Sequence, residues 1–531
     1  MDKKWWTLVA VCLGTFMLLL DVTIVNVALP NIQTSLHANF SDLQWVVDAY
    51  ALSLASLLLT SGSLADLFGR RIVFSIGLVI FTAGSVLCGA AQSPLFLILS
   101  RAGQGIGGAI MFATSLALLA SAFQGRERGV AFGVWGAITG VAVAIGPVLG
   151  GVLTSELSWR WIFFVNIPIG AFALLVSLTR IAESREARAR RPDWAGFVIF
   201  SAALIALVYG LIRADQKSWG DTGVIICFAV AGAGIVAFVL AERFGGHPMF
   251  DLSLFRLPTF VGGSIAAFAL SATLFALLLY LVIYLQDDLG FSALGTGVRL
   301  LLLSGGILAT STLAGRASSR VPVKWLIAPG LVLVGVGLLL MRGLTGTSSW
   351  THLIPGFIVA GLGTGLINPP LASTAVGVVE PARAGMASGI NSTFRQVGIA
   401  TGIAALGTIF ATHLASQVRS GLGAIPDLAG RSGQISALVG NGASGPAVAM
   451  APPQYRGRLA AVIHSSFTSS LDEILLIGAV VALAAAVLSL LLIRQRDFAQ
   501  GSAAHAAGAE DAAADRSNGA GSGTTAVSEK T

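Results

Sequence analysis

Long apolar runs recur along the whole 531-residue chain and constrain its fold more than any other feature. Most of them are close to the 20 residues that an α-helix needs to cross about 30 Å of hydrocarbon. Only 11% of the residues are charged and 55% are hydrophobic, which does not suit a water-facing exterior. The alternating ten-residue strands of an outer-membrane barrel are not visible in the sequence. The sequence therefore predicts an all-α polytopic membrane protein.

The positions of these runs predict fourteen transmembrane helices. We place them at 5–29, 46–65, 72–91, 95–122, 130–154, 161–180, 194–213, 222–241, 260–285, 296–315, 325–341, 352–376, 386–411 and 471–493. An even number of spans puts both termini on one side of the membrane. Lys and Arg gather in the loops on that side, as in Arg70 and Arg71. By the positive-inside rule we expect a cell-membrane protein with both termini in the cytoplasm.

An internal repeat predicts the domain organisation. "RAGQGIGGAI" from Arg101 matches "VAGLGTGLIN" in the predicted twelfth helix, so a six-helix unit occurs twice. Secondary transporters are commonly built from such repeated bundles, with a substrate site between them. We expect a six-helix bundle at 1–180, two inserted helices at 181–250, a second six-helix bundle at 251–498 with a long outer loop at 412–470, and a disordered cytoplasmic tail at 499–531.

Two charged residues lie inside predicted spans. Asp21 interrupts "TFMLLLDVTIVNVALP", and Arg101 precedes the glycines of the fourth helix. A charge at the centre of a spanning helix costs at least about 2.5–3.5 kcal/mol on insertion scales, so such residues face a cavity or a partner. Both lie roughly 10–13 Å from the outer end of their helix, as estimated from 1.5 Å per residue. We expect this acid and this base to share one water-filled cavity.

The glycine-rich segment "GQGIGG" permits two interpretations. Gly103, Gly105 and Gly108 satisfy the dinucleotide-binding pattern, and Glu127 follows at about the spacing of a ribose ligand. The pattern, however, lies within a membrane span and has no preceding strand. Small residues at this spacing allow helices to pack closely in lipid, which is the interpretation we adopt. No Walker lysine is present, which disfavours ATP-driven transport.

Further motifs lie in the loop after the second helix and in the fifth helix. In "GSLADLFGRR", Gly69 permits a tight turn and Asp66 can interact with the positive end of a neighbouring helix. "GVAVAIGPVLGG" combines a kinking proline with glycines that allow close approach. Three residues in or near spans are candidates for lining a cavity or contacting substrate, namely Asp48, Asn368 and Arg395.

Together these motifs resemble the major facilitator superfamily, and within it the fourteen-helix drug:proton antiporters of the EmrB/QacA type. The resemblance covers about residues 5–495 and includes "LDVTIVNVALP", "GSLADLFGRR", "LSRAGQGIGGA", "GPVLGG" and "WRWIFFVNIPIG". It departs from the family pattern at Leu67, where a basic residue is usual, and in the second-half counterpart "AGRASSRVPVKW", which lacks the acidic residue.

The resemblance implies roles for individual residues. Asp21 would be the protonation site and Arg101 its partner in proton coupling. Asp66, Gly69, Arg70 and Arg71 would form a conformational latch between the two bundles. The fifth-helix element, which is associated with antiporters, would shape that helix against the other bundle and limit leakage; its residues are Gly140, Gly146, Pro147, Gly150 and Gly151.

We therefore expect a monomeric secondary transporter that exports drugs, antibiotics or other amphipathic organic molecules in exchange for protons. It would need no cofactor and no metal, because the proton gradient supplies the energy, and it would bind no nucleic acid. One alternative is an exporter dedicated to an endogenous metabolite or lipid. A second is a proton-coupled uptake transporter, which the fifth-helix element argues against. A third is a membrane receptor or enzyme, for which no metal cluster or nucleophile–base spacing is visible.

Overall fold

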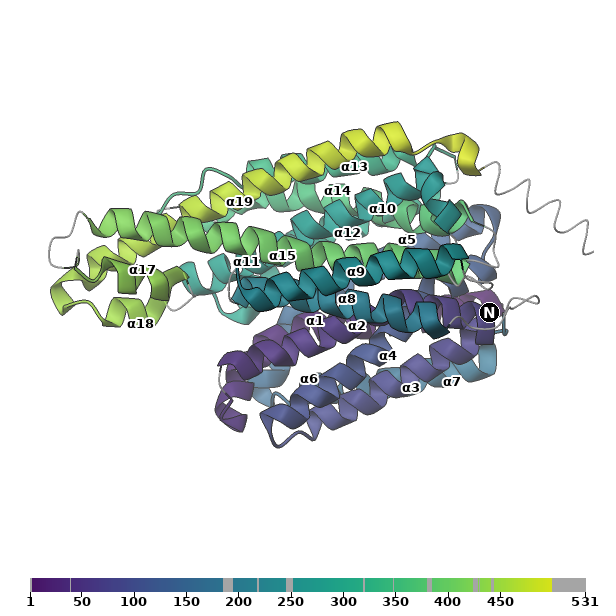
Figure 1. Ribbon diagram of the computed structural model, residues 1–531, viewed down its shortest axis with the longest axis horizontal. Helices are drawn as coiled ribbons and strands as arrows, with labels where there is room; N and C mark the ends of the chain where they lie inside the picture. Colours follow the sequence, from purple (N-terminus) through teal and green to yellow (C-terminus); the bar gives the residue numbers. More distant parts are fainter. Residues whose placement is uncertain are drawn as a thin grey trace, which may run out of the picture.

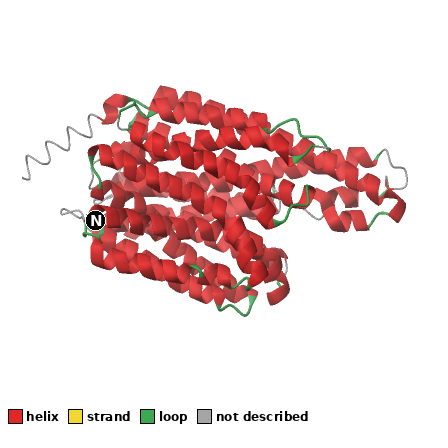
Figure 2. Cartoon of the chain, turned by 180° about the vertical axis from the view of Figure 1, so that it is seen from behind, coloured by secondary structure: helices red, strands yellow, loops and turns green. Residues whose placement is uncertain are grey.

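The computed structural model describes most of the chain. The described ranges are 2–38, 40–184, 194–216, 219–244, 252–318, 320–346, 348–379, 384–423, 428, 430–440 and 444–498. Throughout these ranges the regular structure is helical, without a β-strand (Figure 2). The prediction of an all-α protein is confirmed. The predicted tail at 499–531 lies outside the described residues.

The first bundle is built around α4. Its helices are α1 (Lys3–Leu36), α2 (Phe40–Phe68), α3 (Arg70–Gly89), α4 (Pro94–Ala122), α5 (Gly125–Glu156), α6 (Trp161–Phe164) and α7 (Asn166–Arg180). Helix α4 contacts α2 and α3 closely because its glycines leave room for their backbones. A Cβ added to Gly105 would lie 2.6 Å from the carbonyl oxygen of Tyr50 in α2, and one added to Gly107 would clash with the backbone of Phe81 in α3. The helix-packing interpretation of "GQGIGG" is confirmed at these two glycines.

The second bundle follows two inserted helices. It consists of η1 (Leu252–Arg256), α10 (Pro258–Leu270), η2 (Ser271–Phe275), α11 (Ala276–Ile283), η3 (Tyr284–Asp288), α12 (Ala293–Ala317), α13 (Lys324–Leu340), η4 (Trp350–Leu353), α14 (Ile354–Gly377), α15 (Ala384–Leu422) and α19 (Arg456–Leu492). Segments η2 and η3 are π-helical turns within one span of Pro258–Gln286. The two bundles lie side by side, and the N-terminus and the carboxyl end of α19 are at the same end of the molecule (Figure 1).

The inserted helices are α8 (Trp194–Gln216) and α9 (Thr222–Phe244). They pack on each other, and α8 contacts both bundles. The hydroxyl of Ser201 in α8 lies 3.2 Å from that of Thr60 in α2. At the far end of α8, the indole Nε1 of Trp219 donates to Thr408 Oγ1 of α15 at 2.7 Å. Helices α2 and α15 also contact each other. The inserted pair therefore lies along the seam where α2 and α15 meet.

The segment predicted as a long outer loop is largely helical. Helix α15 continues to Leu422 and α19 begins at Arg456, and between them lie α17 (Ser432–Gly440), α18 (Ser444–Ala449) and η6 (Pro453–Tyr455). These elements form a lobe at the end of the molecule opposite the termini (Figure 1). Val418 and Leu459 are fully buried within it. The Gly- and Ser-rich composition predicted a loop. The segment is helical instead, because apolar side chains spaced along it form a buried helix face.

Among the described residues, ten helices are long and apolar enough to cross a membrane, and two bent pairs raise the number to twelve. The bent pairs belong to α2 and α5. Two shorter apolar helices, Ala195–Leu211 and Lys324–Leu340, coincide with two further predicted spans. The chain is a multi-pass membrane protein, whereas the count of fourteen and the cytoplasmic position of the termini stay predictions.

Candidate functional site

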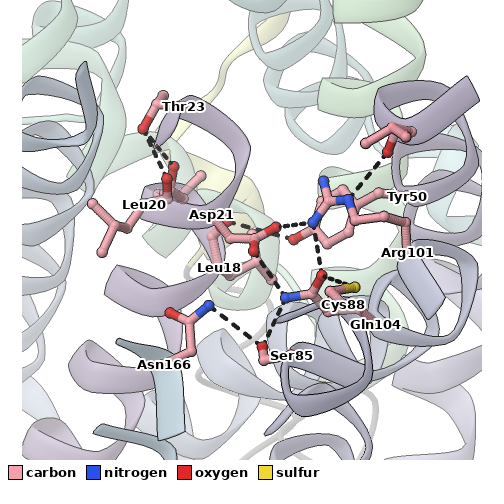
Figure 3. Close-up of polar contacts among 12 residues, drawn as sticks. Leu18, Leu20, Asp21, Thr23, Tyr50, Ser85, Cys88, Arg101, Gln104 and Asn166 are labelled. Atoms are coloured by element: carbon pink, nitrogen blue, oxygen red, sulfur yellow. Dashed lines mark hydrogen bonds and ion pairs between the residues drawn. The ribbon is translucent and has the colours of Figure 1, made fainter. Parts of the chain in front are cut away.

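The two intramembrane charges predicted from the sequence meet inside the first bundle. Arg101 of α4 donates a hydrogen bond from Nη1 to Asp21 Oδ2 of α1 and forms an ion pair with it. Their side chains are 1% and 0% exposed. The expected water-filled cavity is therefore wrong for this conformation. The pair is enclosed within one bundle, where it lies among side chains such as Tyr50 of α2, Ser85 of α3 and Gln104 of α4 (Figure 3).

Gln104 lies one turn after Arg101 on the same face of α4 and forms hydrogen bonds with both members of the pair. Its Nε2 donates to Asp21 Oδ1 and to Ser85 Oγ, each at 2.8 Å. Its Oε1 accepts from Arg101 Nη1 at 2.7 Å and lies 3.6 Å from the thiol of Cys88. Gln104 was not predicted from the sequence. Its i+3 spacing from an embedded arginine was the available signal, since residues three apart share a helix face.

The remaining surroundings of Arg101 replace the water that its guanidinium has lost. Nε donates to the carbonyl oxygen of Val46 at 3.1 Å. The guanidinium carbon lies 4.2 Å from the ring centroid of Tyr50 and 5.9 Å from that of Phe163. A planar guanidinium can form an ion pair, hydrogen bonds and aromatic contacts at once, which an ammonium group cannot reproduce. The site is thus built for arginine rather than for a generic positive charge.

This arrangement suits the charged form of Asp21. Both carboxylate oxygens accept hydrogen bonds from protein donors, one from Arg101 and one from Gln104. Removing one member of a buried ion pair typically costs about 3–5 kcal/mol, because the other charge is left without compensation. Neutralising Asp21 in this conformation would therefore strand the buried guanidinium of Arg101.

The predicted latch residues lie where the two bundles meet near the termini. Asp66 Oδ1 accepts from Nε and Nη2 of Arg70 at 3.0 and 2.8 Å, and Asp66 Oδ2 accepts from the backbone amide of Met386 in α15 at 3.0 Å. Gly69 has φ of 106°, in the left-handed region that glycine tolerates. Arg71 instead faces Glu183, with Nε and Oε2 3.5 Å apart. The structure thus joins Asp66 and Arg70, and separates Arg71 from them.

The fifth-helix residues divide between two neighbours. An added Cβ at Gly140 would lie 2.8 Å from Ile307 of α12, in the other bundle. At Gly146 it would instead clash with Thr23 of α1, in the same bundle. The expectation that the whole element faces the other bundle is therefore wrong for Gly146. Gly150 is buried and Gly151 half-buried, and the Pro147 side chain lies outside the described part of the chain.

A second polar pair lies at the interface between the bundles. Arg395 of α15 donates from Nη2 to Asn368 Oδ1 of α14 at 3.0 Å, and both side chains are buried. Asn368 lines a small cavity between α5 and the second bundle, together with Thr139 and Ser304. The Asp48 side chain, also predicted as a cavity candidate, lies outside the described residues. No cluster of three or more His, Cys, Asp or Glu side chains arranged to hold a metal occurs in the described ranges.

Comparison with known proteins places this site in context. Residues 11–402 match the family model described as the Major Facilitator Superfamily. The chain is 38% identical to the Multidrug resistance protein Stp of Mycobacterium tuberculosis over 79% of each chain. It is 32% identical to the Tetracenomycin C resistance and export protein of Streptomyces glaucescens, over 92% of this chain and 91% of that one.

A solved structure shows the same fold at low sequence identity. The human organic anion transporter MFSD10 superposes with a TM-score of 0.58 at 16% identity, covering 91% of this chain and 100% of that one. At this identity the likeness concerns the fold alone.

Proposed function

Because this chain belongs to the Major Facilitator Superfamily, we propose that it is a proton-coupled antiporter of the fourteen-helix drug-efflux type. It exports amphipathic organic molecules, including drugs or antibiotics, across the cell membrane. Relatives named for multidrug resistance and for antibiotic resistance and export support the substrate class. The outward direction rests on the antiporter element of the fifth helix and on the relative named for export. The energy source rests on the site in the first bundle.

The observation that carries the proposal is the sealed pair of Asp21 and Arg101. A carboxylate held by a buried cation favours the conformation in which the two are paired, whereas a protonated carboxyl group loses that attraction. Protonation therefore shifts the balance between conformations, since a ligand shifts an equilibrium by its differential affinity for the two states. With Asp21 fully buried here, proton exchange belongs to another conformation of the cycle, in which α1 and α4 move apart.

The proposed cycle uses this shift to drive export. Facing inward, Asp21 releases its proton to the cytoplasm and the cavity between the bundles accepts substrate. The bundles then rock, substrate leaves on the outer side, and Asp21 is protonated from outside. Each positive charge that moves inward across 100 mV supplies about 2.3 kcal/mol. That is enough for a concentration ratio of about fifty for one neutral substrate per proton, since every 1.4 kcal/mol is tenfold.

Transport by Asp21→Asn in proteoliposomes tests the proposal. With a pH gradient imposed, the wild type should accumulate a fluorescent drug, and Asp21→Asn should lose this response while still eluting as a folded protein in detergent. Glu127→Gln is the matched control, because Glu127 is an exposed acid that pairs with Lys4 at 2.8 Å, outside the buried network. Gradient-driven accumulation by Asp21→Asn at the wild-type rate would overturn the role of the carboxylate.

A narrower function remains as a second candidate. The Tetracenomycin C relative is named for resistance to and export of one compound, which favours an exporter dedicated to a single endogenous metabolite. Transport of a panel of unrelated drugs decides between the two. Activity toward several members supports multidrug efflux, and activity toward none supports the dedicated exporter.

A further inference from the structure

Arg395 is a second buried guanidinium, and its surroundings differ from those of Arg101. Arg395 lies at the interface between the bundles and is 8% exposed. Within the described ranges, Arg395 makes a single hydrogen bond, to Asn368 Oδ1 at 3.0 Å, and forms no ion pair with a carboxylate. Arg101, by contrast, has Asp21 as a counterion. A buried charge without a counterion is costly, which marks a functional site within a membrane protein.

The cavity beside this pair supplies no negative charge. Asn368 lines it, and the hydroxyl groups of Thr139 and Ser304 are bonded to the carbonyl oxygens of their own helices, at 2.9 and 3.3 Å. The other lining side chains are mostly apolar, such as Leu274 and Phe275. The volume is about 10 Å³, close to the smallest space that holds one water molecule. In this conformation the bundles are therefore closed around the cavity.

The buried acid of the facing helix α2 is engaged elsewhere. Asp66 accepts from Arg70 and from the amide of Met386, which marks the level where α2 and α15 meet. Arg395 lies nine residues further along α15, which is about 13 Å from that level at 1.5 Å per residue. Asp66 therefore does not serve as its counterion.

We propose that Arg395 is the binding group for an anionic substrate, so that the exported molecules are amphipathic acids. The proposal rests on the export function above and names its substrate class. When the bundles part, Arg395 presents its free guanidinium nitrogens to a carboxylate or a comparable oxyanion. Asn368 keeps the guanidinium oriented through Oδ1. The apolar side chains of the cavity then cover the rest of the substrate.

The competing explanation is that Arg395 only fastens α14 to α15. A structural clamp would affect all substrates alike, whereas a binding group affects them according to their charge. The test therefore measures a ratio between matched probes. Dansylglycine carries a carboxylate, its methyl ester is neutral, and dansylcadaverine is a cation, while all three share one fluorophore.

Equilibrium binding of these probes to the purified, full-length transporter is measured by fluorescence. For the wild type we expect the carboxylate to bind at least about tenfold more tightly than the ester, as a charge-assisted hydrogen bond provides. Arg395→Gln should bring this ratio close to one, and Arg395→Lys should restore part of it. Arg299→Gln is the matched control. Its guanidinium carbon lies 3.5 Å from the ring centroid of Phe291, and Arg299 is not among the residues that line the cavity, so the ratio should stay at the wild-type value.

Three results would overturn the proposal. They are a wild type that binds none of the probes or prefers the cation, an unchanged ratio in Arg395→Gln, and an equal loss of carboxylate and ester binding in that variant. The experiment uses no pH gradient, so it is independent of proton coupling. A charge preference in a transporter that fails to respond to a gradient would reject the coupling and keep the substrate class.

Discussion

Asp66, at the carboxyl end of α2, accepts a hydrogen bond from the backbone amide of Met386, 3.0 Å away in the first turn of α15. The two residues belong to opposite bundles. The amides of a first helical turn have no partner within their helix, and the helix dipole makes that end positive. A carboxylate there is a favourable partner. This contact joins the bundles at the end of the molecule where the N-terminus and the carboxyl end of α19 lie (Figure 1).

Replacing Asp66 should loosen this end of the molecule. Asp66→Asn weakens a charge-assisted hydrogen bond, worth about 1.5–3 kcal/mol when the group is charged, and it removes the carboxylate charge that pairs with Arg70. We expect a larger population with the termini-side ends of the bundles apart. Spin labels at two exposed positions, Phe68 and Val321, report the distance by double electron–electron resonance.

A cysteine-free background and one control variant make this measurement specific. Glu127→Gln removes an ion pair with Lys4 that lies within the first bundle, so its distance distribution should match the wild type. An Asp66→Asn distribution equal to that of the control would show that the contact does not hold the bundles together.

Gln104 should be needed for a stable charge network. Gln104→Ala removes the donor to Asp21 Oδ1 and the acceptor for Arg101. Leaving buried polar groups without partners costs about 1–3 kcal/mol each, so thermal unfolding in detergent should occur at a lower temperature. Proton-coupled transport should also fall, because the carboxylate loses its second donor.

Thr114→Ala is the control on the same helix. Among the described residues, the Thr114 hydroxyl bonds to the carbonyl oxygens of Ile110 and Met111 in its own helix alone. Its loss should therefore change the unfolding temperature little and leave transport unchanged. Equal behaviour of the two variants would remove Gln104 from the network.

Glycines of the fourth helix should differ in their tolerance of alanine. Gly105→Ala places a Cβ 2.6 Å from the Tyr50 carbonyl oxygen, and Gly107→Ala forces one against the backbone of Phe81. Overpacking of this kind costs about 1–3 kcal/mol. A Cβ at Gly103 meets nothing within 4 Å. The temperature of thermal unfolding should therefore fall in Gly105→Ala and Gly107→Ala, and stay at the wild-type value in Gly103→Ala. Comparable loss at Gly103 would contradict the packing described here.

Asp221 should stabilise the start of α9 in a pH-dependent way. Its Oδ1 accepts from Arg213 Nε at 2.7 Å and from the amide of Gly223 at 3.0 Å. The hydrogen bond from Arg213 lowers the pKa of the Asp221 carboxyl below its ordinary 3.8. A lowered folded-state pKa stabilises the protein above the ordinary value, and this contribution is lost as the pH falls through the folded-state pKa.

Asp221→Ala should therefore unfold at a lower temperature than the wild type at pH 7, and the gap should narrow below about pH 4. Scanning fluorimetry at one fixed heating rate measures both temperatures across the pH range. A gap that stays constant down to pH 3 would show that the carboxylate charge does not contribute.

Much of the candidate site could be predicted because charges in hydrocarbon are expensive. Asp21 and Arg101 were identified from their presence in apolar runs, and that cost does not depend on which helices are neighbours. Gln104 was missed because a neutral amide in a span carries a weaker signal. Its role follows from the rotation of α4, which turns Gln104 toward both Asp21 and Ser85. The outer segment was misjudged because its composition is loop-like, while its helices are stabilised by contacts such as those of Val418 and Leu459.

The sequence by itself determined that the chain is helical and that it crosses the membrane many times, because span length and apolar composition are local properties. Only the tertiary structure decided which charges meet. It sealed Asp21 within one bundle instead of opening it to a cavity, joined Asp66 to Met386 across the bundles, and left Arg395 with an amide in place of an acid. These contacts depend on the rotation and register of the packed helices. That rotation and register depend in turn on the packing of many small side chains from several helices.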